Sequence, residues 1–176
     1  PVDVIQEYIR PARLVENGSI VTKPALSDRE IMDFEKAGKL ETFNTDGLRS
    51  LIYTMNHIPD MKEKTLRYEG HIDLIIALQQ AGFFDTAPIR VNDVDITPFE
   101  FTSKLLVNEW KLGEEEQEFT VMKVIVKGEE KTVEYNLYDE YDVATKTSSM
   151  ARTTGYTCTA AVNLIAKNMF TEKGVF

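Results

Sequence analysis

Two consecutive strand–turn–helix patterns in the first half of the chain constrain the fold more than any other feature of the sequence. Residues 40–43 have the composition of a strand, the polar turn 44–47 follows, and apolar residues at helical spacing continue to Met55. A second strand is expected over 62–68 and a second helix over 71–81. Because consecutive strands are usually neighbours in a sheet, we expect these two strands to lie side by side.

The N-terminal part is expected to contain a short helix and a hairpin. Residues 2–9 carry one apolar stripe at helical spacing, and Asn17-Gly18 is the strongest short signal for a hairpin turn. Ser27 begins a capping-box pattern, which predicts a helix over 28–36. The two strands of the hairpin are expected over residues 13–16 and 19–22.

The sequence pattern of the C-terminal half predicts more strands than helices. Thr97 and Pro98 are a typical start of a helix, here expected to end near Trp110. Hairpins are expected over residues 89–91 with 94–96 and over 119–126 with 131–138, and a last helix over 159–169. The strand 119–126 is apolar on both faces, which favours a central place in a sheet, and the small residues of 159–169 favour close packing on a sheet. With no repeat or linker, residues 1–176 are expected to form one α+β domain.

Composition limits the partners and the compartment. The net charge of −9, from 29 acidic and 20 basic residues, argues against nucleic acid as the main partner. Cys158 is the single cysteine, so no internal disulfide can form and a reducing, cytoplasmic location is expected. No apolar run approaches the roughly 20 residues that a membrane span needs. Because the chain starts at Pro1 and stops directly after a helical pattern, we expect it to be a piece of a longer polypeptide.

Several kinds of site are not predicted. The nine glycines never fall in a dinucleotide-binding or Walker pattern, so no nucleotide cofactor is expected on this chain. His57 and His71 are the only histidines and lack neighbouring soft ligands, which argues against a metal site. Cys158 lies among small residues, which favours buried packing over a nucleophile. The run 113–118 is interpreted as a solvated acidic loop.

Polar and basic residues gather at the two turns that follow the strands 40–43 and 62–68. If these strands run parallel, both turns emerge at the same end of the sheet. The side chains expected to converge there are those of Asn44, Arg49, Lys64, Arg67, Tyr68 and His71. Such a cluster suits a small ligand with several carboxylates, since arginine binds a carboxylate through two parallel hydrogen bonds. The alternative is structural: Asp46 or Thr45 caps the following helix, and Asp46 pairs with Arg49.

These motifs resemble the saccharopine dehydrogenase family. The segments that carry the resemblance are 8–13, 43–49, 63–71, 110–113 and 149–156, in the same order over nearly the whole chain. The resemblance implies an oxidoreductase that uses NAD or NADP to act on the CH–NH group of saccharopine or a similar amino acid of lysine metabolism. It also implies that an N-terminal Rossmann domain, which binds the cofactor, is missing here, so that the isolated fragment would be inactive.

The fold implied by the resemblance is a mixed β-sheet with helices mainly on one face, like the C-terminal domain of glyceraldehyde-3-phosphate dehydrogenase-like oxidoreductases. This domain would bind substrate and form a homodimer, and residues 150–176 would return toward the Rossmann domain. The residues implied to bind substrate are Asn44, Thr45, Asp46, Arg49, Lys64, Arg67, Tyr68 and His71, with Thr153 and Thr154 near the cofactor boundary. Tyr68 and His71 are the candidates for proton transfer.

One position departs from the family pattern. Glu69 precedes Gly70, where relatives often have proline, and an acidic residue there weakens the local positive field. The substrate could therefore carry more amine and less carboxylate, as those of lysine 6-dehydrogenase and carboxynorspermidine synthase do. A domain that keeps the fold for small-molecule binding or dimerisation without catalysis is the alternative from another class.

Overall fold

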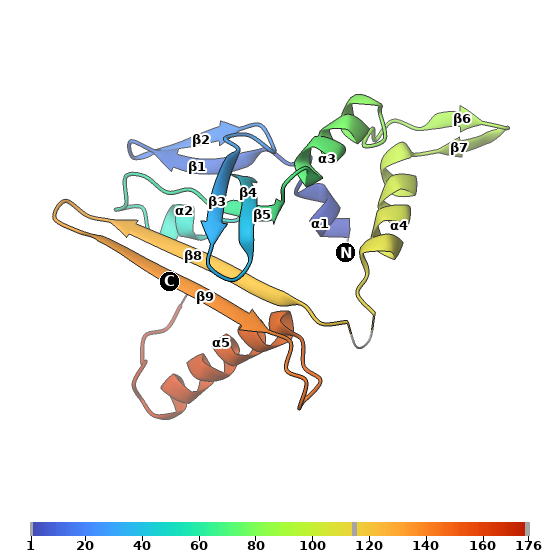
Figure 1. The fold of residues 1–176 in the computed structure, drawn as a ribbon. Helices are drawn as coiled ribbons and strands as arrows, with labels where there is room; N and C mark the ends of the chain where they lie inside the picture. The colour runs from blue at the N-terminus through green and yellow to red at the C-terminus, as the bar shows by residue number, and fades with distance from the viewer. Residues whose placement is uncertain (1, 114–115, 175–176) are drawn as a thin grey trace. The chain divides into compact units, whose positions relative to one another are not determined.

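The computed structural model describes residues 2–113 and 116–174, and these form two compact units (Figure 1). The first unit extends to Lys111 and the second runs from Leu112 to Gly174, and each is described by itself. That the whole chain is one substrate-binding and dimerisation domain stays a prediction, because compact units are a finer level of organisation than a domain. The α+β class is confirmed, with helices and small antiparallel sheets along the chain.

The elements of the first unit follow most of the sequence patterns. Its helices are α1 (Val2–Gln6), α2 (Leu51–Thr54), α3 (His71–Gln80) and α4 (Pro98–Trp110). Its strands are β1 (Ala12–Glu16), β2 (Ser19–Lys23), β3 (Glu30–Phe34), β4 (Gly38–Asn44), β5 (Lys64–Tyr68), β6 (Ile89–Val91) and β7 (Val94–Ile96). Both short predicted hairpins, β1–β2 and β6–β7, are confirmed.

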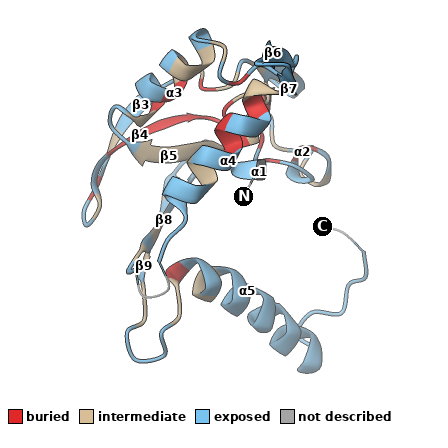
Figure 2. Ribbon diagram, turned by 90° about the vertical axis from the view of Figure 1, so that its right-hand side faces the viewer, coloured by how far each residue is buried: buried red, intermediate tan, exposed pale blue. Residues whose placement is uncertain are grey.

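The strand β4 is the centre of the first unit. It lies between β3 and β5 and is antiparallel to both. Its residues from Leu40 to Asn44 are all buried (Figure 2). Phe43, fully buried, belongs to a core that α1, α3 and α4 complete with Ile5, Tyr8, Ile72, Ile75 and Phe99. Side chains from these three helices thus join Phe43 in one core cluster, which agrees with the prediction of helices mainly on one face.

The helix predicted over residues 28–36 is wrong, because this segment forms β3. Met32 and Phe34 turn inward at alternate positions while their neighbours are exposed, and β3 pairs with β4 along its whole length. The capping-box residues have other partners: Ser27 donates to the carbonyl of Pro24, and Glu30 binds Lys64. Tertiary strand pairing therefore overrides the local helix signal.

The helix predicted after the turn 44–47 is much shorter than expected. It is the single turn α2, its N-cap is Ser50, and neither Thr45 nor Asp46 caps it. Ile52 and Leu48 pack on Val15, whose backbone also bonds to that of Met61. A small second core therefore holds α2 against the β1–β2 hairpin.

The second unit contains β8 (Phe119–Lys127), β9 (Thr132–Glu140) and α5 (Ser149–Ala166). The predicted long hairpin is confirmed, but a central place for its first strand is wrong, since β8 pairs only with β9 among the described strands. The last helix begins at Ser149, earlier than expected, because Ser148 accepts a hydrogen bond from the backbone N–H of Ala151 as an N-cap. Most of α5 is exposed (Figure 2), including the small residues expected to pack on a sheet.

Candidate functional site

The pairing of β4 with β5 divides the predicted site residues between two faces of the sheet. The strands are antiparallel, so the turns that follow them leave at opposite ends, and the predicted convergence at one end is wrong. Residues directly opposite each other share a face. Arg67 lies opposite Glu41, on the face that also holds Phe43. Lys64, Tyr68 and their partners Asn44 and Leu40 lie on the other face.

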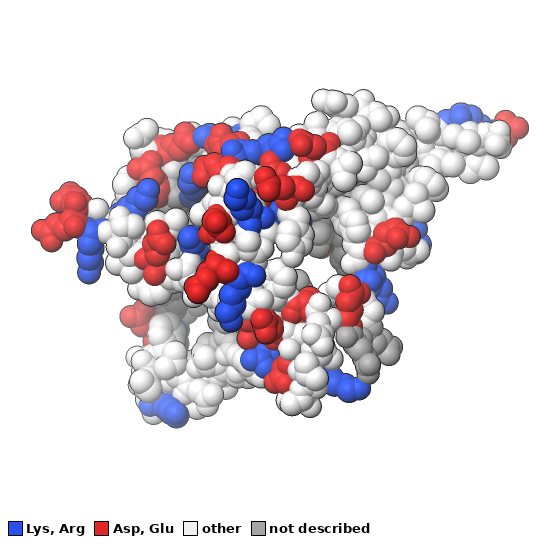
Figure 3. All heavy atoms as spheres, viewed as in Figure 1, with Lys and Arg blue, Asp and Glu red and all other residues white. Residues whose placement is uncertain are grey.

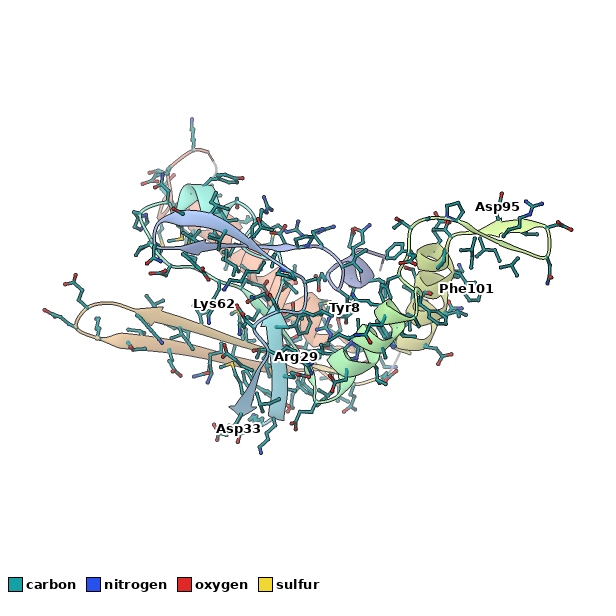
Figure 4. The ribbon with its side chains drawn as sticks, turned by 90° about the horizontal axis from the view of Figure 1, so that it is seen from above. Tyr8, Arg29, Asp33, Lys62, Asp95 and Phe101 are labelled. Carbon is teal, nitrogen blue, oxygen red and sulfur yellow. The ribbon has the colours of Figure 1, made fainter. Side chains whose placement is uncertain are left out.

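On the Phe43 face, Tyr8 joins α1 to the beginning of α3 (Figure 4). Its hydroxyl lies 3.0 Å from Nε2 of His71, and Nε of Arg67 donates to the same hydroxyl at 3.1 Å. Trp110 closes the cluster, with its ring centroid 5.4 Å from that of His71 and edge-on to Tyr8. The guanidinium of Arg67 also lies 5.9 Å from the centre of the Tyr8 ring, within the range of a cation–π contact.

Arg67 can only donate, so the Tyr8 oxygen accepts from Nε of Arg67. The same hydroxyl also hydrogen-bonds with Nε2 of His71, and the tautomer of the imidazole decides which of the two atoms donates. Burial lowers the pKa of His71 below its ordinary value of 6.5, and the positive charge of Arg67 lowers it further. The lowered pKa therefore favours a neutral His71 rather than a member of a cationic group.

A small pocket opens on the same side of the sheet, with a volume of about 50 Å³. Its walls come from the turn after α1, the turn after β4 and the start of β5, and its lining residues are Glu7, Arg10, Thr45, Asp46, Gly47, Arg49, Glu63 and Thr65. Pockets for whole small molecules are usually about 300–1,000 Å³. By itself this pocket has room for one polar group of a ligand.

Asp46 forms one side of the pocket and is held by Arg13. The two side chains make a bidentate pair, with Nε to Oδ1 at 2.8 Å and Nη2 to Oδ2 at 2.9 Å. The hydrogen bonds from Arg13 hold the pKa of Asp46 below its ordinary value of 3.8. Nη1 of Arg49 is 3.9 Å from Asp46. The Asp46–Arg49 pair of the structural alternative is therefore present, but it is weaker than the Asp46–Arg13 pair.

Glu63 holds the turn after β4 from the other side. It accepts hydrogen bonds from the hydroxyl of Thr45 and from the backbone N–H of Gly47, the latter at 3.1 Å. The hydroxyls of Thr45 and Thr65 are 2.9 Å apart. A Cβ atom on residue 47 would collide with the Glu63 carboxylate, so the two hydrogen bonds that Glu63 accepts from this turn require glycine at position 47.

Asn44, Lys64 and Tyr68 lie away from the pocket. The amide of Asn44 donates to Ser27 at 3.1 Å and to Asp28 at 2.9 Å, and Lys64 binds Glu30 at 2.6 Å. These donors hold the β3 side of the sheet together, which is a structural task. Tyr68 is 60% exposed at the far end of β5. A role of these three residues in substrate binding stays a prediction without geometric support.

Glu7, Arg10, Glu63 and Tyr8 belong to the site, although the sequence analysis did not single them out. Three of them lie on or just after α1. The apolar stripe over residues 2–9 predicts that helix but cannot show which face of the sheet it covers. The motif 8–13 contains Tyr8 and Arg10, so the family resemblance held a usable signal. For Glu63, the signal was its place directly before β5.

Thr153 and Thr154 lie on the first turns of α5 in the second unit. The hydroxyl of Thr153 donates to the carbonyl of Ser149 at 2.9 Å, and Thr154 is exposed. Next to them, Arg152 bridges Asp139 and Asp142. Their proposed nearness to a cofactor stays a prediction.

Three further expectations concern Cys158, His57 and metal binding. Cys158 is exposed on α5, so the prediction of buried packing is wrong. His57 is exposed as well. Among residues 2–113 and 116–174, no group of His, Cys, Asp and Glu side chains has the arrangement of a metal site. Within the same ranges, no helix is long and apolar enough to cross a membrane.

The comparisons with known proteins agree with this fold. The family model of the saccharopine dehydrogenase C-terminal domain matches residues 1–176, and the chain therefore belongs to that family. The solved structure of apo histidine-tagged saccharopine dehydrogenase (L-Glu forming) from Saccharomyces cerevisiae matches with a TM-score of 0.68 and 16% identity. The match covers 99% of this chain and 54% of that one, so the chain spans about half the length of that protein. The resemblance seen in the motifs is thereby confirmed.

Proposed function

We propose that this chain is the substrate-binding domain of an NAD- or NADP-dependent oxidoreductase that acts on the CH–NH group of saccharopine or a similar amino acid. The single observation that carries the proposal is the pair of guanidiniums that line the pocket on the Phe43 face, those of Arg10 and Arg49, with the charge of Arg67 acting on the same pocket through Glu7. Membership of the saccharopine dehydrogenase family supports the reaction class. The isolated chain is proposed to be inactive.

The open donors of Arg49 support a ligand with carboxylates, although Glu7, Asp46 and Glu63 also line the pocket. Arg49 is 59% exposed on its side chain and makes one loose contact with Asp46, so most of its donors are open to a ligand. A guanidinium matches a carboxylate with two parallel hydrogen bonds, an arrangement that an ammonium cannot reproduce. We therefore assign a substrate carboxylate to Arg49, with the walls of the pocket holding it in place.

The nicotinamide cofactor does not fit the residues described here. A dinucleotide is held where parallel strands and a glycine-rich turn meet the N-terminus of a helix. Every described strand pair is antiparallel, and the turn between β5 and α3 carries Glu69 and Gly70 without a glycine repeat. We assign the nucleotide to a Rossmann domain outside this chain, and we derive no catalytic step through it.

A homodimer belongs to the same proposal. Met122, Val124 and Val126 alternate along β8, so they share one face of the hairpin, and Tyr135 lies opposite Val124 on β9. All four are at least 40% exposed. An apolar sheet face of this kind supports an interface between two copies. A cytoplasmic location remains part of the proposal, on the basis of the single cysteine.

The test is an activity assay of the full-length protein with each of three substrates: L-saccharopine, L-lysine and carboxynorspermidine. Reduction of NAD⁺ or NADP⁺ is followed by absorbance for the first two, and oxidation of the reduced cofactor is followed during synthesis of the third. We expect turnover with L-saccharopine. Activity with L-lysine alone, or only in the synthesis of carboxynorspermidine, would change the proposed substrate but leave the proposed reaction class unchanged. Inactivity with all three would favour the alternative, a non-catalytic binding or dimerisation domain that kept the fold.

The variant Arg49→Ala tests the site within that assay. Loss of a bidentate pair with a carboxylate should cost about 1.5–3 kcal/mol, which lowers kcat/KM by roughly tenfold to a hundredfold. The matched control is Arg90→Ala, since Arg90 is an exposed arginine of the β6–β7 hairpin that pairs with Asp95 (Figure 4). Equal kcat/KM values for the wild type and Arg49→Ala would show that the carboxylate binds elsewhere.

A further inference from the structure

Asn17 and Gly18 form the two-residue turn between β1 and β2, and both are exposed. Their φ angles are +50° and +73°, in the left-handed region that a tight hairpin turn of this kind requires. Among the asparagines of the chain, Asn17 alone precedes a glycine. This pair is the sequence most prone to deamidation, because glycine has no Cβ atom to hinder attack by its own backbone nitrogen.

Deamidation begins when the backbone nitrogen of Gly18 forms a bond to Cγ of the Asn17 side chain. The nitrogen gives its proton to water, the side-chain nitrogen leaves as ammonia, and a cyclic succinimide remains. Water then opens this ring at either of its carbonyl groups, which yields aspartate or isoaspartate at position 17. The reaction therefore needs a Gly18 nitrogen that is free to lose its proton and to approach the side chain.

In the folded chain the backbone of this turn is held by residues 59–61, which we call the strap. The N–H of Gly18 donates to the carbonyl of Pro59 at 2.8 Å. The N–H of Asn17 donates to Oδ1 of Asp60 at 3.0 Å. Because the attacking nitrogen is engaged in a hydrogen bond, the turn must leave the strap before the reaction can begin.

The strap itself is anchored in the small second core. Met61 exchanges two backbone hydrogen bonds of 2.9 Å with Val15, and it packs against the cluster of Val15, Leu48 and Ile52. Release of the turn is therefore opposed by packing as well as by the two hydrogen bonds from the turn.

The turn between β6 and β7 shows that the strap is not a requirement of the left-handed backbone. Asn92 and Asp93 have φ angles of +46° and +65°, close to those of the first turn. Within residues 2–113 and 116–174, no hydrogen bond joins the backbone of this second turn to a segment outside its hairpin. The strap is thus a separate feature of the one turn that carries the reactive pair.

We propose that Asn17 is a deamidation site of this protein and that the strap sets the rate of its modification by engaging the Gly18 nitrogen. The product opposes the strap in turn. Aspartate at position 17 brings a second carboxylate next to Asp60, whose Oδ1 already binds the backbone there. Isoaspartate lengthens the backbone of a turn that pairs Glu16 with Ser19. Modification therefore weakens the strap and favours further opening.

The experiment follows position 17 in the full-length protein during incubation at mildly alkaline pH. Peptide mapping by mass spectrometry measures the fraction of aspartate and isoaspartate for the wild type and for Asp60→Ala. We expect modification of the variant to be about fivefold faster, as the loss of one hydrogen bond would allow. The matched control is Asp33→Ala, which removes an exposed acid of β3 outside the strap and should keep the wild-type rate. In urea, all three proteins should react at one common, faster rate.

Two further variants complete the design. Asp60→Asn keeps an acceptor oxygen, so it should react more slowly than Asp60→Ala, and circular dichroism verifies that both are folded. Asn17→Asp reproduces one product with a residue that tolerates a positive φ, and it should lower the urea concentration at which the protein unfolds. Equal rates for the folded wild type and Asp60→Ala, or a folded wild type that reacts as fast as in urea, would overturn the role of the strap. An Asn17 that stays intact in urea would overturn the site itself.

Discussion

At the scale of single residues, the hydroxyl of Tyr8 links the charged guanidinium of Arg67 to the neutral imidazole of His71. The hydroxyl of Tyr8 stands between the two, accepting from Arg67 at 3.1 Å and lying 3.0 Å from Nε2 of His71. Protonation of His71 would bring a second donor to the same hydroxyl, next to an existing cation. The folded state therefore favours the neutral imidazole, and this preference has a measurable effect on stability.

The variant His71→Gln is expected to reduce the acid sensitivity of folding. Because the pKa of His71 is lowered in the folded state, the unfolded chain binds more protons between the lowered value and 6.5. The free energy of unfolding must then fall as the pH drops from about 7 to about 5, and His71→Gln removes this part of the decrease. Urea unfolding at the two pH values measures it. The control, His57→Gln at an exposed position, should keep the wild-type decrease; an equal decrease in all three proteins would contradict the prediction.

The variant Asp46→Asn is expected to destabilise the chain at neutral pH. The side chain of Asp46 is only 7% exposed and accepts two hydrogen bonds from Arg13, and bonds to charged groups contribute about 1.5–3 kcal/mol. Since the pKa of Asp46 is lowered, its contribution is present above 3.8 and is lost as the pH falls through the folded value. Urea unfolding near neutral pH measures the loss. Asp33→Asn, at an exposed position of β3 (Figure 4), should change little.

At the scale of elements, two glycines, Gly70 and Gly155, differ in their backbone conformation. Gly70, between β5 and α3, has φ = +87°, while Gly155 lies inside α5 with no unusual φ. A Cβ atom would meet nothing within 4 Å at either position. The same substitution therefore tests backbone conformation alone at both sites.

Alanine at these two positions is expected to have opposite effects on stability. Gly70→Ala forces a left-handed conformation on a residue with a Cβ and should cost about 1–2 kcal/mol. Gly155→Ala removes a poor helix former from an exposed helix position and should stabilise the second unit by about 1 kcal/mol. Thermal unfolding followed by circular dichroism measures both shifts. A loss of stability in both variants would mean that Gly155 has a packing role.

Local sequence patterns predicted the elements that depend on neighbouring residues alone. They gave the wrong element where pairing with a distant strand decides the conformation. The turn residues Asn17 and Gly18 predicted the β1–β2 hairpin because a positive φ at these positions is a local property. In contrast, Ser27 and Glu30 are compatible with both a helix start and a strand, and only the presence of β4 decides between them.

The candidate site was predicted in part. Arg49 lines the pocket, and Arg67 and His71 contact Tyr8, but the assumption of parallel strands gave the wrong geometry. In an antiparallel pair, alternate positions of β5 determine which side chains meet, so Arg67 faces α1 and Tyr68 does not. Glu7 could not be found this way, because its place depends on how a helix of five residues docks on the sheet.

At the scale of the whole molecule, charge and apolar surface are distributed differently. Figure 3 shows basic and acidic side chains interspersed over the β1–β5 region of the first unit, so the side drawn there is not one acidic face. In the second unit, the face of β8 that holds Met122, Val124 and Val126 carries no charge, and α5 exposes Val162 and Ile165. For the proposed homodimer, such apolar surface is a better candidate interface than the charged surface.

The variant Val124→Glu is expected to weaken a dimer of the full-length protein. A charge at the centre of the apolar β8 face would be buried without a partner in an interface, which costs several kcal/mol. Sedimentation velocity over a range of concentrations measures the monomer–dimer equilibrium. Val94→Glu, at an exposed valine of the β6–β7 hairpin in the first unit, is the control and should leave the equilibrium unchanged. A wild type that remains monomeric would contradict the proposed dimer.

The contact between Tyr8 and His71 spans 63 residues of chain, and this separation has a consequence for synthesis. During translation α1 leaves the ribosome before the other elements described here, yet a helix of five residues is not stable without tertiary contacts. The hydrogen-bond partners of Tyr8, which are Arg67 and His71, emerge only after about sixty further residues have been added. We therefore expect Ile5 and Tyr8 to stay exposed to chaperones until β5 and α3 have been synthesised, and the pocket to be completed only then.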